Sequence, residues 1–361
     1  MVEKIDNDLF QIIYKNKACK TKYYEEITDE LYNEIISELN TKPKKSEVYK
    51  QLKSVSTGST QLGIVNNYYF KDLMDNTKVY YNNWSIKEFF ESKDLVGHSI
   101  AKIKATPDFY NDENSTYTNI RRFLQLGGKG VASEIYNFPL KVVNDILECY
   151  NINNNYYDFS CGWGSRLLSA LAHSINYFGT DPNNILCDRL LELEKDFKFV
   201  SFCKSNVKLY VQGSELFIPE LHNKIGVAFS SPPYYCLEDY KIGNQSYNEN
   251  ISYEDWLNNY LKPTIQNIYS YLIDNGYFLI NINDFDKYTL VKDTISIAEN
   301  VGFRLLGKHT LNNIKRCNTA GDFNDNSEGI FVFCKSHSNN KIRKLTNDIK
   351  ITPKSITKKL F

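Results

Sequence analysis

The sequence predicts an α/β protein in which a doubly wound parallel sheet follows a mostly helical region. From about Val131 onward, short apolar segments alternate with amphipathic helical segments, which is typical of a parallel sheet covered by helices on both faces. Before that point, apolar residues recur at the spacing of a helix. Three glycines, Gly127, Gly128 and Gly130, separate the two patterns. We therefore place a domain boundary at these glycines.

The boundary divides the chain into a helical region over 1–130, an α/β domain over 131–336 and a basic tail over 337–361. In the first region, Leu31, Ile35, Ile36 and Leu39 fall on one face of a predicted helix that ends before the polar segment 40–45. Further helices are expected over 86–90 and 120–126.

Seven apolar segments of the second region are predicted strands. They are 156–160, 177–180, 207–211, 227–230, 276–282, 303–306 and 330–333. Helices fit between most of them, with a helix over 140–150 leading into the first strand and a capping box of Ser252 and Asp255 beginning another. The polar segment 312–327 between the last two strands is long for a loop in a compact domain, which favours a functional or disordered loop.

The composition limits the classes of function that the chain can have. The 361 residues are 42% hydrophobic, enough for two cores, and the 43 basic residues balance the 43 acidic ones. A zero net charge argues against nucleic-acid binding through bulk charge, so a nucleic-acid partner would need local charge. The segment 335–361 supplies one asymmetry, because it holds eight basic residues and the single acid Asp348; the basic residues are Lys335, Lys341, Arg343, Lys344, Lys350, Lys354, Lys358 and Lys359. The tail is either a solvated segment or a phosphate contact.

Targeting and metal signals are weak. No run of 18 apolar residues occurs and residues 1–6 carry charge, so we expect a soluble protein without a membrane segment, in a prokaryotic or phage-infected cytoplasm. The eight cysteines form no Cys-x-x-Cys pair and the five histidines lie at no ligand spacing from them. We therefore expect no metal site.

A glycine-rich turn follows the first predicted strand. Asp158 and Ser160 precede Gly162 and Gly164, and a helix is expected from about Arg166. The two glycines let the backbone approach a ligand, and the helix start favours an anionic group such as a carboxylate. Leu167 stands where a dinucleotide fingerprint needs its third glycine, which argues against a nicotinamide or flavin cofactor.

Two further strand ends extend the predicted cofactor site. Asp181 ends the second strand, where a carboxylate would bind a ribose diol through two charge-assisted hydrogen bonds. Gly213 and Ser214 follow the third strand, where small and polar residues could contact an adenine ring. Phe138 and Pro139 lie upstream of the first strand and are either a simple helix start or part of the same site. The combination indicates a nucleoside cofactor that carries a carboxylate.

The fourth predicted strand runs directly into Ser231, Pro232, Pro233 and Tyr234. Two prolines at the end of a parallel strand hold the backbone rigid and leave carbonyl groups without local partners. An amino group on a nucleic-acid base is a poor nucleophile until acceptors draw its hydrogens out of the ring plane. We assign these acceptors to the Ser231 hydroxyl and the Pro232 carbonyl, with Tyr234 stacking on the extrahelical base.

Together, segments 158–165 and 231–234 resemble the amino-methyltransferase family that acts on DNA bases through S-adenosyl-L-methionine. The resemblance covers roughly 133–335 and implies a Rossmann-like, seven-stranded methyltransferase sheet with a reversed final strand. It also implies that Asp181 binds the ribose, that Phe138 and Pro139 border the methionine moiety, and that Ser231 to Tyr234 hold the target base. A serine at the start of the second motif is typical of the branch that methylates cytosine N4.

The resemblance implies DNA as the partner, with a restriction endonuclease or a phage protein as a further candidate partner. Target recognition is assigned to no segment, and the candidates are residues 1–130 and the loop 312–327 with Lys315 and Arg316. Methylation of adenine N6, of an RNA base or of a protein amide are the alternatives, and a catalytically idle nucleic-acid-binding protein is another. Methylation at cytosine C5 is disfavoured because it needs a thiolate, and the chain contains no Pro-Cys dipeptide; Cys236 is interpreted as a packing residue.

Overall fold

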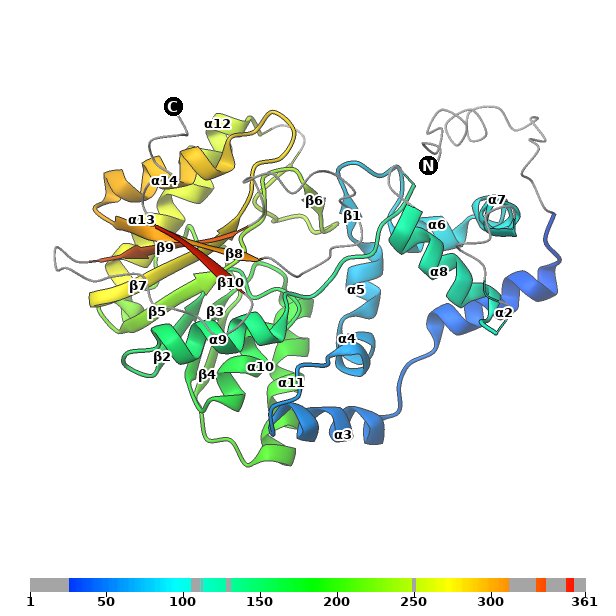
Figure 1. Cartoon of the computed structure of the whole chain (residues 1–361), viewed down its shortest axis with the longest axis horizontal. Coiled ribbons are helices and arrows are strands. Elements are labelled where there is room, and N and C mark those ends of the chain that lie inside the picture. The colour runs from blue at the N-terminus through cyan, green and yellow to red at the C-terminus, as the bar shows by residue number, and fades with distance from the viewer. Residues whose placement is uncertain are drawn as a thin grey trace.

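A mostly parallel sheet organises the chain (Figure 1). The computed structural model describes residues 26–104, 111, 113–127, 131–248, 251–311, 329–335 and 349–353. The main sheet has the strand order β10-β8-β9-β7-β5-β2-β3-β4. Its strands are β2 (Asn155–Asp158), β3 (Asn176–Thr180), β4 (Val207–Tyr210), β5 (Ile225–Ser230), β7 (Leu272–Ile282), β8 (Arg304–Leu311), β9 (Gly329–Cys334) and β10 (Ile349–Pro353). The seven predicted strands are all present, and the α/β fold class is confirmed.

The order of the strands creates a crevice above the middle of the sheet. β2 pairs in parallel with β3 on one side and with β5 on the other. The chain therefore moves outward from β2 to β4 and then returns across β2 to β5. In open sheets of this kind, ligands bind where the winding direction reverses, beyond the carboxyl ends of the strands.

The far side of the sheet contains the reversed strand that the resemblance implies. β9 lies between β7 and β8 and is antiparallel to both, with Leu279 opposite Val332 and His309 opposite Ile330. β10 then pairs with β8 in antiparallel fashion. It comes from the segment predicted as a basic tail, so the described part of that tail adds an eighth strand at the sheet edge.

Alternating residues of the strands fill two apolar layers. Tyr156, Val227 and Leu279 point into the layer covered by α9 (Leu140–Tyr150), α10 (Ser165–Ala172) and α11 (Asn184–Ser201). Their neighbours Tyr157 and Phe278 point into the opposite layer, under α12 (Tyr253–Trp256), the π-helix η3 (Leu257–Leu261), α13 (Lys262–Tyr271) and α14 (Leu290–Val301). The short 3₁₀ helix η2 (Pro219–Leu221) precedes β5. Burial on both faces explains why the central strands read as continuous apolar runs.

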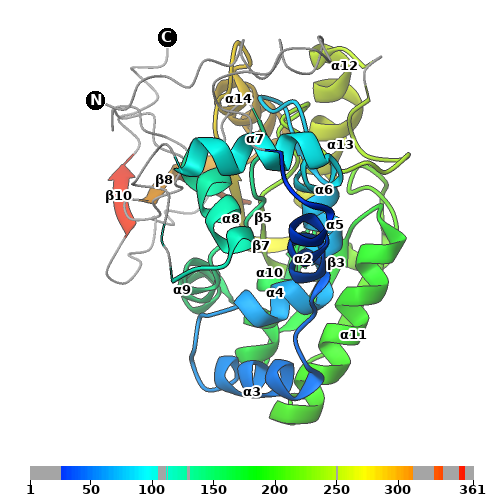
Figure 2. The same cartoon turned by 90° about the vertical axis from the view of Figure 1, so that its right-hand side faces the viewer.

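The helices before residue 131 fall into two groups (Figures 1 and 2), and each group buries its apolar residues in a different core. One group consists of α3 (Lys45–Val55), α4 (Gly63–Tyr69) and α5 (Lys71–Asn76), and its apolar residues, including Leu52 and Phe70, belong to the α9–α11 layer of the sheet domain. The other consists of α2 (Asp29–Asn40), α6 (Ile86–Glu91), α7 (Lys93–Lys104) and α8 (Thr116–Gly127), which bury a separate cluster that includes Phe89 and Val131. We call these the inner and the outer helical group.

Polar contacts attach the inner group to the sheet domain. Lys45 Nζ lies 2.9 Å from Glu192 on α11, and Arg189 NH1 donates to the Tyr69 carbonyl at 2.8 Å. Arg121 of the outer group is ion-paired with Asp75 of α5 at 3.2 Å, which connects the two groups. A two-stranded ribbon of β1 (Lys78–Val79) and β6 (Glu238–Asp239) joins the chain between the groups to the sheet domain.

Several predictions concern segments outside the described residues. The loop 312–327 with Lys315 and Arg316 is one of them, and most of the basic tail is another. Lys335 is described, and its ammonium donates to the Leu272 carbonyl at 2.6 Å and to Asn223 at 3.1 Å. It is therefore bound to the sheet domain. Within the described ranges, no helix combines the length and the apolar character that a membrane crossing requires.

Candidate functional site

A cavity of about 200 Å³ opens in the crevice at the carboxyl ends of the central strands. It is bordered by the turn after β2, by the ends of β3 and β4, and by the segment after β5. Ten residues of the predicted site share its lining: Phe138, Ser160, Gly162, Asp181, Gly213, Ser214, Ser231, Pro232, Pro233 and Tyr234. The predicted cofactor and base sites therefore meet in one cavity.

The glycine-rich turn after β2 needs both of its glycines, for different reasons. Gly162 has φ +57° and lines the cavity, so its backbone is available to a ligand. Gly164 has φ +80° and precedes α10, and a Cβ atom there would lie 2.9 Å from Leu193 and 3.2 Å from Phe70. Gly164 is thus required by the packing of the helix start, and it lies outside the cavity lining.

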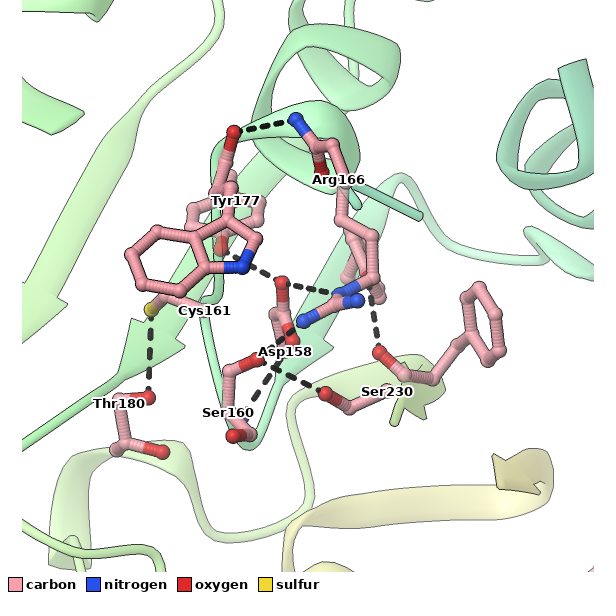
Figure 3. Close-up of polar contacts among 11 residues, drawn as sticks. Asp158, Ser160, Cys161, Arg166, Tyr177, Thr180 and Ser230 are labelled. Atoms are coloured by element: carbon pink, nitrogen blue, oxygen red, sulfur yellow. Dashed lines mark hydrogen bonds and ion pairs between the residues drawn. The ribbon is translucent and has the colours of Figure 1, made fainter. Parts of the chain in front are cut away.

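A buried ion pair between Asp158 and Arg166 holds the glycine-rich turn in place (Figure 3). Asp158 is fully buried and accepts hydrogen bonds from Arg166 Nε at 2.9 Å and from the Tyr177 hydroxyl at 2.8 Å. Arg166 also donates to the Ser160 carbonyl, to which the Ser230 hydroxyl donates at 3.1 Å. These contacts join the ends of β2 and β5, so Asp158 positions the cavity floor and does not itself reach the cavity.

Asp181 directly follows β3 and lines the cavity. Its Oδ1 accepts the backbone N–H of Asn183 at 3.0 Å, and Asn183 in turn caps α11. Burial raises the pKa of the Asp181 carboxyl to about 7, although hydrogen bonds from the backbone of Asn183 and Gly162 lower it in part. A ligand that donates two hydrogen bonds to this group would favour its ionised form.

The segment after β4 presents a second acid to the cavity. Ser214 is held to α13 by its hydroxyl, 2.9 Å from that of Thr264, and by its carbonyl, which accepts from Asn267 at 2.9 Å. The Glu215 carboxylate folds over Gly213, where any side chain would overlap it. Among the described residues, no group hydrogen-bonds the buried Oε2 of Glu215, and burial raises the pKa of this carboxyl. Glu215 can therefore accept a hydrogen bond from a ligand.

The segment after β5 contributes Ser231 and Pro232 to the cavity lining. The Ser231 hydroxyl accepts from Asn281 Nδ2 at 3.3 Å, and Asn281 lies on the neighbouring strand β7. No N–H or O–H group of the described chain is hydrogen-bonded to the Pro232 carbonyl. Tyr234 is half-buried, and its hydroxyl donates to the Asn281 carbonyl at 3.0 Å. The phenol is thus fixed at the sheet while the side chain borders the cavity.

Three predicted residues lie outside the cavity lining. Asp158 and Gly164 support the turn as described, and Pro139 is the N-cap of α9. Phe138 does line the cavity and packs edge-to-face on Phe229 of β5, with ring centroids 5.6 Å apart.

Other lining residues were not predicted. Trp163 lies inside the glycine-rich turn, and its ring is 6.3 Å from that of Tyr240. Tyr260 belongs to the π-helix η3, a distortion that often marks functional sites. Trp256, Tyr260, Ile265, Ile268 and Leu272 recur at the spacing of an ordinary packed helix face, so the sequence contained no signal for a role of Tyr260 in the site. Cys236 is buried as predicted, and burial raises its pKa, which disfavours a thiolate.

No family model and no curated protein matches the chain. Solved structures with low identity do align with part of it. A TehB-like SAM-dependent methyltransferase from Corynebacterium glutamicum is 16% identical, with a TM-score of 0.35, over 54% of this chain and 85% of that one. A putative S-adenosylmethionine-dependent methyltransferase from Listeria monocytogenes is 11% identical, with a TM-score of 0.35, over 54% and 99%.

A geranyl diphosphate methyltransferase solved with geranyl diphosphate and sinefungin is 8% identical, with a TM-score of 0.38, over 54% of this chain and 77% of that one. Identities and TM-scores this low carry no functional argument.

Proposed function

We propose that the protein is an S-adenosyl-L-methionine-dependent methyltransferase that modifies the exocyclic amino group of a nucleic-acid base, with cytosine N4 in DNA as the preferred target. The observation that supports this most directly is that the Ser231–Tyr234 segment and the Asp181 carboxylate border one cavity. A nucleoside cofactor and an amine acceptor could therefore meet there.

The cavity fits the chemistry of the cofactor at three points. Asp181 offers a carboxylate for the two hydroxyl groups of a ribose. Glu215 offers an acceptor without a partner in the described chain, which suits the amino group of adenine. The positive φ of Gly162 exposes backbone beside the start of α10, where an anionic carboxylate is favoured. When bound, the cofactor supplies an activated methyl group on a sulfonium.

The residues after β5 fit a base amine. The Ser231 hydroxyl and the Pro232 carbonyl can each accept one amino hydrogen, which draws the nitrogen lone pair out of conjugation with the ring. Asn281 holds both the Ser231 hydroxyl and the Tyr234 hydroxyl, at 3.3 and 2.9 Å. The acceptor and the stacking ring therefore keep a fixed relative position before the base arrives, which lowers the cost of binding it.

The test is mass spectrometry of nucleosides after DNA is incubated with the protein and S-adenosyl-L-methionine. We expect N4-methylcytosine. Tyr234→Ala should keep cofactor affinity and lose turnover, whereas Asp181→Ala should weaken cofactor binding by about two orders of magnitude, because two hydrogen bonds to a charged group are lost. Isothermal titration measures the affinity.

The alternatives that involve a nucleic acid each have their own outcome in these experiments. N6-methyladenine would assign the adenine branch, and product from RNA alone would replace DNA as the substrate. Nucleic-acid binding without any heat of cofactor binding would indicate an idle binding protein. Full methyl transfer by both variants would contradict the site assignment.

A further inference from the structure

Two exposed tyrosines occupy the centre of a tight turn between the two helical groups. Val79 to Asn82 form the turn, which is closed by a hydrogen bond from Asn82 N–H to the Val79 carbonyl at 2.9 Å. Tyr80 and Tyr81 are its central residues, with 48% and 43% of their surface exposed. Central turn positions usually hold glycine, proline, asparagine or aspartate, so two large aromatic residues there need another explanation.

The turn is fastened to the mouth of the cavity. The Tyr80 N–H donates to the Leu237 carbonyl at 2.7 Å, and Val79 pairs with Glu238 in the β1–β6 ribbon. Leu237 and Glu238 both line the cavity, three and four residues after Tyr234. The two exposed rings are thus carried by a backbone that is hydrogen-bonded to the cavity rim.

The rings meet edge to face and are not stacked on one another. Those of Tyr80 and Tyr81 lie 5.1 Å apart at 82°, and Phe285 of the loop after β7 lies edge-on to Tyr80 at 6.1 Å and 74°. In edge-to-face pairs, the face of at least one ring is not stacked on its neighbour. Because close to half of the surface of each tyrosine is exposed, the turn offers aromatic surface to a planar partner.

We propose that Tyr80, Tyr81 and Phe285 form a stacking platform for the nucleotide next to the target base on the same strand. The proposal rests on the proposed function, because a base that leaves the helix for the cavity brings its neighbour to the rim. Every base has a π-face, so stacking on aromatic side chains holds a strand regardless of its sequence.

Three acids lie beside the turn: Glu238 and Asp239 of β6, and Asp286. Burial and the charge of Asp286 together raise the pKa of the Tyr81 hydroxyl. Asp239 is paired with Lys241 at 2.9 Å, and Glu238 accepts the Tyr240 hydroxyl at 2.6 Å. The two acids of β6 are thus engaged with neighbours. The platform consequently contributes base contacts and leaves phosphate contacts to other surfaces.

The experiment compares the wild type with a double variant that carries both Tyr80→Ala and Tyr81→Ala, in three measurements. DNA affinity is measured by fluorescence anisotropy of a labelled oligonucleotide in the presence of S-adenosylhomocysteine, turnover by nucleoside mass spectrometry, and cofactor affinity by calorimetry. We expect the Kd for DNA and the KM to rise about tenfold or more, with kcat and cofactor affinity retained, because a stacking contact is lost.

Two control pairs accompany this variant. Replacing both tyrosines by phenylalanine keeps the rings and should keep DNA affinity within about twofold. Phe199→Ala with Phe202→Ala removes two rings that are 68% and 83% exposed at the end of α11, and should change DNA affinity by no more than about twofold.

The outcomes separate this inference from the proposed function. If the wild type methylates a base and the alanine pair binds and methylates DNA equally well, the platform is wrong and the proposed function stands. If the phenylalanine pair is as weak as the alanine pair, the hydroxyl groups act in place of the ring faces, which overturns stacking. If the wild type neither binds nor methylates any nucleic acid, the proposed function fails and the platform with it.

Discussion

The inner and outer helical groups precede the sheet domain in one continuous stretch of sequence, yet they differ in how they are attached to it. The inner group, α3 to α5, contributes to the same apolar core as α9, α10 and α11. The outer group, α2 and α6 to α8, buries a core of its own. A shared buried core attaches a region to a domain more firmly than adjacency in the sequence does.

The difference reaches the candidate site. Phe70 of the inner group packs beside Gly164, and its ring lies 6.4 Å from that of Trp163. Asn66 of α4 accepts a hydrogen bond from Asn137 Nδ2 at 3.0 Å, and the same amide donates to the Trp163 carbonyl at 2.6 Å. The inner group therefore supports the glycine-rich turn directly, and the outer group has no such contact among those described.

Core truncation gives the largest test of this comparison. Phe70→Ala and Phe89→Ala each remove a fully buried ring and should each cost about 3–5 kcal/mol of stability. We expect Phe70→Ala also to weaken cofactor binding, because it loosens the support of Gly164, and Phe89→Ala to leave it unchanged. Thermal unfolding and calorimetry measure the two effects. Equal loss of cofactor affinity in both variants would contradict the division.

Arg121 tests the connection between the groups. It is ion-paired with Asp75 of the inner group and hydrogen-bonded to Glu134, and all three side chains are at most 20% exposed. Arg121→Met leaves two shielded acids without this partner and should destabilise the protein by about 3 kcal/mol. Lys87→Met is the control, since Lys87 makes an exposed pair with Glu91 at 3.9 Å that should contribute less than about 0.5 kcal/mol. A similar change in melting temperature for the Arg121→Met and Lys87→Met variants would rule out a structural role for the ion pair that connects the two helical groups.

Asn66 gives a smaller effect, confined to the inner group. Asn66→Ala removes one hydrogen bond of about 1 kcal/mol, so cofactor affinity should fall about fivefold. Asn119→Ala in the outer group removes a hydrogen bond to the Asn111 carbonyl and should lower the melting temperature without changing cofactor affinity. Titration calorimetry distinguishes them, and an unchanged Kd for Asn66→Ala would show that the turn holds its shape without α4.

The pH dependence of cofactor binding is the smallest expected effect. Because burial raises the pKa of Asp181 to about 7, the carboxyl is mostly protonated at pH 6 and mostly ionised at pH 8. The free energy of cofactor binding should therefore be less favourable at pH 6 than at pH 8 by about 1 kcal/mol, and cofactor should raise the melting temperature less at pH 6. Asp181→Asn should remove this difference.

The same variant tests the direction in which the stability of the ligand-free protein changes with pH. Ionising a buried acid costs free energy in the folded state, so stability falls as the pH rises from about 4 to 7, and Asp181→Asn should be more stable than the wild type at pH 8. A lower melting temperature of the variant at pH 8 would mean that the carboxylate is stabilised by its surroundings.

The strands could be predicted because burial on both faces leaves a strong signal in the sequence. All six residues of β5 are buried, and they read as one apolar run. The π-helix could not be predicted, because its residues have the apolar spacing of an ordinary helix. β10 was missed because an edge strand is paired on one side only and needs no apolar run.

The site shows the same limit. Asp158 is the last residue of β2 and Asp181 directly follows β3, so both acids were predicted to contact the ligand. Only the fold brings Arg166 against Asp158 and leaves Asp181 beside the cavity. The division of the first helices was equally hidden, since an apolar helix face has the same pattern whichever core it enters.

The attachment of α3 to α11 also has a consequence for synthesis on the ribosome. Lys45 and its partner Glu192 are 147 residues apart in the chain. At about 5–20 residues per second, α3 is made roughly 7–30 s before the helix that buries its apolar face. The nascent protein has to keep that face soluble during this interval, so a slowly translated chain should depend on chaperones more than the finished fold suggests.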